Sequence, residues 1–157
     1  MPHAKLIRSA YSYLSYIRQN AAIVMTVLQI SAVTLRVSNM TRSCLFYSKL
    51  PGLTLCYGGS NEKFSSFEIK DHGFKSYINL ELSAEIYKHL STNCFRIIFH
   101  TTDIDRLYLV LRNDVDLSRI IVFENEPSNA TWGERYFHLK DPDGYQISFA
   151  TPRNDAD

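Results

Sequence analysis

The sequence is poor in the residues that mark several protein classes. Only six of 157 residues are glycine and three are cysteine, and the few glycines exclude a collagen-like repeat, whereas the 13% of aromatic residues exclude an intrinsically disordered chain. Cys44, Cys56 and Cys94 form neither a CxxC pair nor a zinc-finger spacing, so no disulfide framework or structural metal is expected. We expect three small buried thiols in a reducing compartment, and therefore a cytoplasmic protein.

The chain also lacks a surplus of one charge and a long apolar run. Basic residues exceed acidic ones by only one, 17 against 16, which argues against a nucleic-acid partner. The most apolar run, residues 21–30, is too short to span a bilayer, so no membrane association is expected. The charge is nevertheless uneven, because the first acidic residue is Glu62: residues 1–61 carry six bases and no acid, and residues 62–157 carry eleven bases and sixteen acids. We interpret this as complementary faces between parts of the molecule or between protomers.

The length predicts one domain, large enough to bury about 70% of its unfolded surface without a metal or disulfide. Apolar residues at three- and four-residue spacings over residues 4–20 predict an amphipathic helix. We therefore assign residues 1–28 to an N-terminal helical arm, residues 29–152 to the domain, and residues 153–157 to a tail.

Within the domain, the same order of elements occurs twice, in modules 29–83 and 93–152. Each module begins with an alternating strand, continues with a capped helix, and ends with three further strands, which is the order βαβββ. The sequences also correspond, since Phe67-Glu68-Ile69-Lys70-Asp71 matches Phe137-His138-Leu139-Lys140-Asp141. A repeat of fixed order indicates a doubled fold. The expected helices span about 43–50 and 103–112, and the expected strands are 33–37, 53–57, 64–70, 76–82, 95–101, 120–124, 135–140 and 146–150.

Two motifs at the ends of this frame resemble a known family. Leu35-Arg36-Val37-Ser38-Asn39-Met40, followed by Phe46-Tyr47 and Pro51-Gly52-Leu53, is similar to the opening of the glyoxalase/bleomycin-resistance/dioxygenase group, the vicinal oxygen chelate superfamily. Trp132-Gly133-Glu134-Arg135 and Asp141-Pro142-Asp143-Gly144-Tyr145-Gln146-Ile147 are similar to its closing hairpin. The resemblance implies an α+β fold, in which paired βαβββ modules form a half-open curled-sheet barrel with helices outside and the ligand inside.

The resemblance also implies where a metal would bind. The family's metal-dependent members use one residue from the first and last strand of each module, and these positions here are Ala32, Glu81, Arg96 and Ser148. Only Glu81 is a usual ligand, whereas Ala32 has no donor atom and the Arg96 cation would repel a metal ion. Because such a cage needs three or four donors, we predict no metal and no other cofactor.

The alternation of each strand predicts which side chains line the cup. We expect Arg96 to face Glu81 as an ion pair in place of the metal. In one interpretation Arg96, Arg36 or His100 binds an anionic or carbonyl-bearing ligand; in the other, the pair is a structural salt bridge in a degenerate cavity. The predicted ligand-binding residues are Arg36, Tyr77, Asn79, Glu81, Arg96, His100, Trp132, Tyr136, His138 and Ser148.

Three of these side chains suggest a more specific function for the site. His100 and His138 are the candidates for general acid–base catalysis, because histidine titrates near neutral pH, although each could be a polar wall residue. Together with Glu81 they could also form an atypical metal site. Trp132 could be a lid over the barrel edge or a stacking wall for an aromatic ligand.

These observations favour a metal-independent protein that binds a small anionic or aromatic molecule, in the manner of the family's drug-binding resistance proteins. A homodimer is expected, since those proteins typically form the ligand pocket between two chains. The alternatives are a metal-dependent lyase or dioxygenase of the same superfamily with an atypical ligand set, and a structural or partner-binding protein. Whether the protein is an enzyme is left open, with a binding protein favoured.

Overall fold

The computed structural model describes residues 29–71, 73–83 and 95–153. The expected arm at 1–28 and residues 154–157 of the tail therefore lie outside the described residues, as does Cys94. Among the described helices, none combines the length and the apolar character needed to cross a bilayer.

The first module forms a four-stranded sheet, here called the first sheet. Its strands are β1 (Ala32–Val37), β2 (Leu53–Tyr57), β3 (Phe64–Asp71) and β4 (Phe74–Leu82), and helix α2 (Met40–Lys49) follows β1. The strand order is β1-β4-β3-β2, with β1 parallel to β4 and the other pairs antiparallel.

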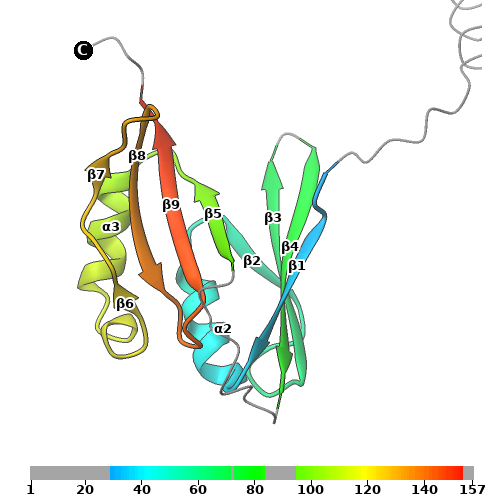
Figure 1. Cartoon of the computed structure of the whole chain (residues 1–157). Coiled ribbons are helices and arrows are strands. Elements are labelled where there is room, and N and C mark those ends of the chain that lie inside the picture. The colour runs from blue at the N-terminus through cyan, green and yellow to red at the C-terminus, as the bar shows by residue number, and fades with distance from the viewer. Residues whose placement is uncertain (1–28, 72, 84–94, 154–157) are drawn as a thin grey trace, which may run out of the picture.

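The second module forms the second sheet with the same topology. Strands β5 (Arg96–His100), β9 (Gln146–Pro152), β8 (Glu134–Lys140) and β6 (Val122–Phe123) lie in that order, and β7 (Ser128–Asn129) also pairs with β8. Helix α3 (Ile104–Asn113) follows β5, and a short 3₁₀ helix, η2 (Leu117–Arg119), follows α3. The predicted α+β fold of paired βαβββ modules is confirmed, and the described strands form two sheets that are not closed into a barrel (Figure 1).

The two helices, each expected to be capped, begin with the same type of cap. The side chain of Asn39 accepts a hydrogen bond from the backbone N–H of Arg42, and Asp103 accepts one from the N–H of Arg106, each at 3.0 Å. These caps satisfy donors that the first turn of a helix leaves unpaired.

The strand expected at 120–124 is shorter than predicted. The Asp114 side chain accepts hydrogen bonds from the backbone N–H groups of Asp116 (2.9 Å) and Leu117 (3.1 Å). These bonds start η2, and the chain leaves this 3₁₀ turn only at Ile120. Of the residues expected in the strand, Val122 and Phe123 therefore form the ladder with β8.

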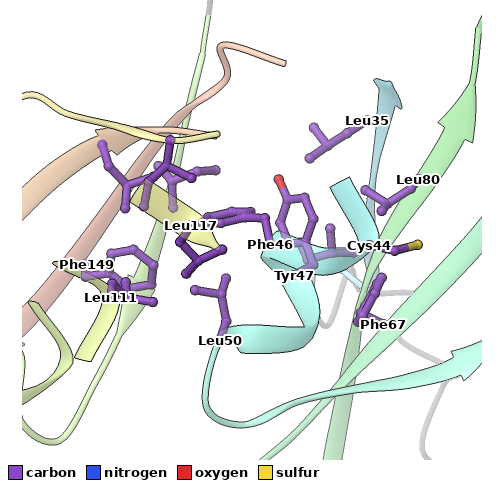
Figure 2. Packing of buried hydrophobic residues seen from close by; sticks show 14 of the residues in the cluster. Leu35, Cys44, Phe46, Tyr47, Leu50, Phe67, Leu80, Leu111, Leu117 and Phe149 are labelled. Atoms are coloured by element: carbon purple, nitrogen blue, oxygen red, sulfur yellow. The ribbon is translucent and has the colours of Figure 1, made fainter. Parts of the chain in front are cut away.

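One hydrophobic core joins the two modules. Phe46 and Tyr47 of α2 are fully buried, and Figure 2 shows them between Leu35 of the first sheet and Leu117 and Phe149 of the second module. Both sheets turn their apolar faces to this core, because apolar and polar residues alternate along the strands. Within the described ranges, neither α2 nor α3 covers the polar faces (Figure 1).

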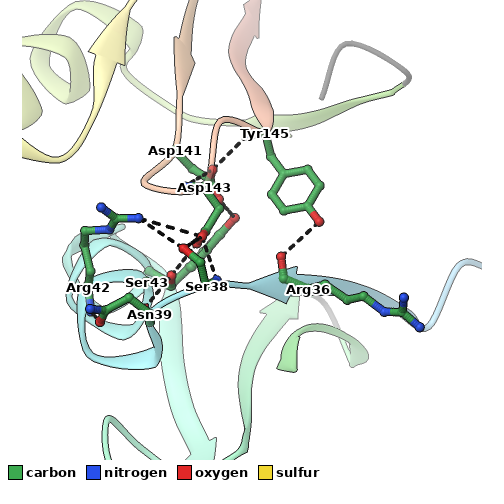
Figure 3. Close-up of polar contacts among 9 residues, drawn as sticks. Arg36, Ser38, Asn39, Arg42, Ser43, Asp141, Asp143 and Tyr145 are labelled. Atoms are coloured by element: carbon green, nitrogen blue, oxygen red, sulfur yellow. Dashed lines mark hydrogen bonds and ion pairs between the residues drawn. The ribbon is translucent and has the colours of Figure 1, made fainter. Parts of the chain in front are cut away.

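Polar contacts at one turn fix the junction between the modules (Figure 3). The turn between β8 and β9 carries Asp143, whose carboxylate accepts hydrogen bonds from the Ser38 N–H (2.8 Å) and hydroxyl (2.6 Å) and the Ser43 hydroxyl (2.6 Å). Beside it, the Tyr47 hydroxyl donates to Asp141 at 2.9 Å. Burial raises the pKa of Asp141 to about 6, and burial next to this carboxylate raises the pKa of Tyr47 well above its ordinary value. The turn therefore docks the second module on the first turns of α2.

Candidate ligand-binding site

The predicted site residues lie on the two polar sheet faces, and these faces do not cover each other. The side chains of Arg36 and Glu81 on the first sheet are 58% and 52% exposed. On the second sheet, the His100 side chain is 64% exposed and Trp132 is 68% exposed. The described residues of a single chain thus present two open polar surfaces.

The first sheet brings together four predicted residues. Arg36 lies opposite Glu81 in the β1–β4 register, and their side chains approach to 3.7 Å. Asn79 accepts a hydrogen bond from the Ser66 hydroxyl at 2.7 Å, and the Tyr77 hydroxyl donates to Glu68 at 3.4 Å. This surface is a network of internally paired polar groups.

Glu68 anchors that network. Lys70 and Lys75 lie 2.7 and 2.9 Å from its carboxylate, and their hydrogen bonds lower the pKa of Glu68 to about 2. It is therefore a fully charged carboxylate with its oxygens in use, which makes it a structural group and not a proton acceptor.

The second sheet brings together Arg96, His138 and Ser148. Arg96 Nη1 lies 3.2 Å from His138 Nε2, and His138 Nδ1 lies 2.7 Å from Ser148 Oγ. A guanidinium can only donate, so Nε2 must be the acceptor. In the neutral imidazole the proton is then on Nδ1, which donates to Ser148. Ser148 is only 2% exposed, so this contact holds the ring from beneath.

The charge state of His138 follows from the same geometry. Burial and the Arg96 cation lower the pKa of His138, because both disfavour a positive imidazolium. The imidazole is neutral near pH 7, and its only basic nitrogen is occupied by Arg96. His138 is therefore unavailable as a general base unless the guanidinium moves.

Aromatic rings extend from this group along the sheet face. The rings of Trp132 and Tyr136 stack with centroids 5.6 Å apart, and Tyr136 lies 4.7 Å from the His138 ring. At the Trp132 end of these rings, Glu134 accepts a hydrogen bond from Trp132 Nε1 at 2.8 Å and lies 3.2 Å from His100 Nε2. We call Trp132, Tyr136 and His138 the ring row. Trp132 lies on this face, although the sequence left open whether it was a lid or a stacking wall.

The expected ion pair between Arg96 and Glu81 is wrong. Glu81 pairs with Arg36, while Arg96 lies 3.2 Å from His138 and 4.0 Å from Glu124. The pair requires the two polar faces to oppose each other, and within one chain they do not: Glu81 meets Arg36 on the adjacent strand β1, while Arg96 on β5 reaches across β9 to His138 on β8.

The residues at the family's metal positions do not fit a metal. Ala32 has no donor, the Ser148 hydroxyl is engaged by His138, and Arg96 brings a positive charge. The atypical set of His100, His138 and Glu81 is not assembled either, since these side chains have Glu134, Arg96 and Arg36 as partners. Within the described part of the chain, no three His, Cys, Asp or Glu side chains are grouped to hold a metal ion.

Sequence reasoning missed three charged residues of the second sheet. Glu134, Lys140 and Glu124 lie on the polar face, and Glu124 is 3.7 Å from Lys140. Extending the period of two from Tyr136 and His138 by one step in each direction would have found Glu134 and Lys140. The expectation of buried thiols holds for Cys44, whose burial raises its pKa, but is wrong for Cys56, which is exposed on the edge strand β2.

A shallow hollow of about 240 Å³ lies elsewhere, at the start of α3, and is lined by Asp103, Asp105, Arg135 and Arg153 among others. It contains none of the predicted site residues. Arg135 is already paired with Asp105 at 2.6 Å, so this guanidinium is not free to bind a ligand in the hollow.

Comparisons with known proteins agree with this architecture. The sequence profile described as the Glyoxalase/Bleomycin resistance protein/Dioxygenase superfamily matches residues 29–149. A glyoxalase/bleomycin resistance protein/dioxygenase from Nocardioides superimposes with a TM-score of 0.62 at 17% identity, covering 91% of this chain and 95% of its own.

Two further solved structures share the fold. A glyoxalase/dioxygenase from Nostoc punctiforme has a TM-score of 0.62 at 20% identity, covering 83% of this chain and 99% of its own. A superfamily member from Sphaerobacter thermophilus has a TM-score of 0.57 at 22% identity, covering 81% and 99%. No curated protein matches the chain.

Proposed function

Since the chain belongs to the glyoxalase/bleomycin resistance protein/dioxygenase superfamily, we propose that it binds a small anionic or aromatic molecule on the polar face of the second sheet, without a bound metal. The observation that carries this proposal is the placement of the Arg96 guanidinium beside the ring row. A cation next to stacked aromatic rings can hold a charged group and a flat apolar group of the same ligand.

Arg96 is suited to this role because its present partners leave donors unused. Of its five N–H groups, Nη1 is directed at His138, and Nη2 is 4.0 Å from Glu124, too far for a hydrogen bond. Its side chain is 35% exposed, so a ligand can reach it.

The donor set supports a metal-free site. A divalent cation at Glu81 would have to displace its Arg36 contact, and the remaining family positions supply an alanine, an arginine and an engaged serine, with no histidine or second carboxylate. The chemistry of these residues favours an anion over a cation.

We further propose that a second copy of the chain completes the site. The resemblance implies a pocket formed between two chains, and the part of the chain that the structure describes leaves both polar faces open. Their charges are complementary in part, since each carries both a basic and an acidic group that a partner could meet. The mass in solution tests this, and a strictly monomeric protein that still binds ligand tightly would contradict it.

The binding proposal is tested by a thermal-shift panel of small organic acids and aromatic compounds, with and without added divalent metals, followed by calorimetry on each hit. Arg96→Ala should weaken the affinity more than tenfold, because it removes a charge-assisted hydrogen bond. Arg119→Ala, which removes an equal charge from the exposed end of η2, should leave the affinity unchanged. A panel without a hit, or a hit that Arg96→Ala does not weaken, overturns the proposal.

A further inference from the structure

The hydrogen bond between Arg96 and His138 controls where a proton can go. Nδ1 of His138 already carries a hydrogen directed at Ser148 Oγ. A second proton could bind only at Nε2, but there it would point at the N–H of Arg96, 3.2 Å away. His138 can therefore accept a proton only when the guanidinium turns to another acceptor.

A carboxylate ligand would draw the Arg96 guanidinium away from His138. Carboxylates engage two N–H groups of arginine in a planar fork, and this pairing is stronger than a bond to a neutral nitrogen. A carboxylate placed between Arg96 and His138 would accept from the guanidinium on one side. On the other side it could accept from Nε2–H, once that nitrogen is protonated. The ring attached to it would lie along Tyr136 and Trp132.

The charged groups around His138 favour this rearrangement, in which Arg96 turns to the carboxylate and His138 takes up a proton. Arg96 faces it from β5, Glu124 from the segment after β6, and Ser148 from β9, while Tyr136 and Lys140 flank it on β8. Glu124 lies near both cations, 4.0 Å from Arg96 and 3.7 Å from Lys140, so the immediate surroundings of His138 carry one net positive charge, while Glu134 lies further along the face at Trp132. An added carboxylate would cancel this positive charge and make a protonated imidazole favourable.

We infer that the ligand is an aromatic carboxylate, and that its binding at Arg96 is coupled to the uptake of one proton from solvent by His138 Nε2. This inference rests on the proposed function and adds to it the ligand class and a dependence on pH. Affinity should rise about tenfold for each unit of decreasing pH between the His138 pKa of the complex and that of the free protein, and should be flat outside that window.

Benzoate is the probe, and benzamide is its uncharged control. The titration of His138 is followed by NMR of protein labelled at histidine, with His138→Gln used for assignment. Saturation with benzoate should raise the His138 pKa by about one unit, and benzamide should not raise it. Without any ligand, Arg96→Gln should also raise this pKa, whereas Arg119→Gln should leave it unchanged.

The outcomes separate the inference from the proposed function. Benzoate that binds without changing the His138 titration overturns the proton coupling and leaves the binding function standing. Failure of benzoate to bind at any pH above about 5, where it stays ionised, overturns the ligand class, while the wider panel still decides the binding function. An unchanged His138 pKa in Arg96→Gln also overturns the coupling.

Discussion

Asp141 at the junction should make the protein more stable as the pH falls from 7 to 5. The carboxyl group is 3% exposed, and its pKa in the folded protein is about 6, against 3.8 as the ordinary value. The folded state therefore binds a proton more readily than the unfolded state in this range, so stability is lost as the pH rises. A difference of roughly two pKa units corresponds to about 3 kcal/mol at pH 7, and about half of that remains at pH 5.

Asp141→Asn tests this reasoning, because asparagine resembles the protonated acid. Its oxygen can still accept from the backbone N–H groups of Asp143 and Tyr145, and its amide can donate to the Tyr47 hydroxyl. At pH 7 the variant should be at least as stable as the wild type, by up to about 3 kcal/mol. The advantage should fall to about half of its pH 7 value at pH 5.

The assay is urea unfolding at pH 7 and pH 5 for the wild type, for Asp141→Asn, and for Glu62→Gln, which removes one charge from an exposed position. Only the difference between wild type and Asp141→Asn isolates the junction, since other carboxylates titrate in both proteins. A difference that stays constant between the two pH values, or that matches the one for Glu62→Gln, would refute the reasoning.

Three further predictions concern stability and metal content. Tyr47→Phe should destabilise by about 1–3 kcal/mol in urea unfolding, because it leaves the buried Asp141 carboxylate without one donor; no change would show that the junction tolerates an unpaired carboxylate. Gly58→Ala should destabilise by about 2 kcal/mol more than Gly52→Ala: both glycines have positive φ, at 74° and 89°, but only at Gly58 would the new Cβ meet the carbonyl oxygen of Phe64; equal losses would contradict this. Protein purified without added ions should contain no stoichiometric zinc, nickel, manganese or iron by elemental analysis, and a full equivalent of any of them would contradict the metal-free site.

The sequence predicts local features of this fold well, because their causes are local. The caps at Asn39 and Asp103 and the alternation that places Tyr136 and His138 on one face follow from neighbouring residues. The bond between Tyr47 and Asp141 joins residues 94 positions apart and depends on how the two modules dock. The wrong prediction that Arg96 pairs with Glu81 also depends on docking. Strand alternation predicts on which sheet face a residue lies, but it does not predict what packs against that face.

The docking of the β8–β9 turn on α2 has a consequence for synthesis of the chain. Ser43 and Tyr47 emerge early from the ribosome, but the carboxylates that accept their hydrogen bonds belong to residues 143 and 141. The first module therefore lacks these partners for α2 until the β8–β9 turn has been translated. Because the core is shared by both modules, a ribosome that stalls after the first βαβββ unit would leave an aggregation-prone fragment instead of a working half.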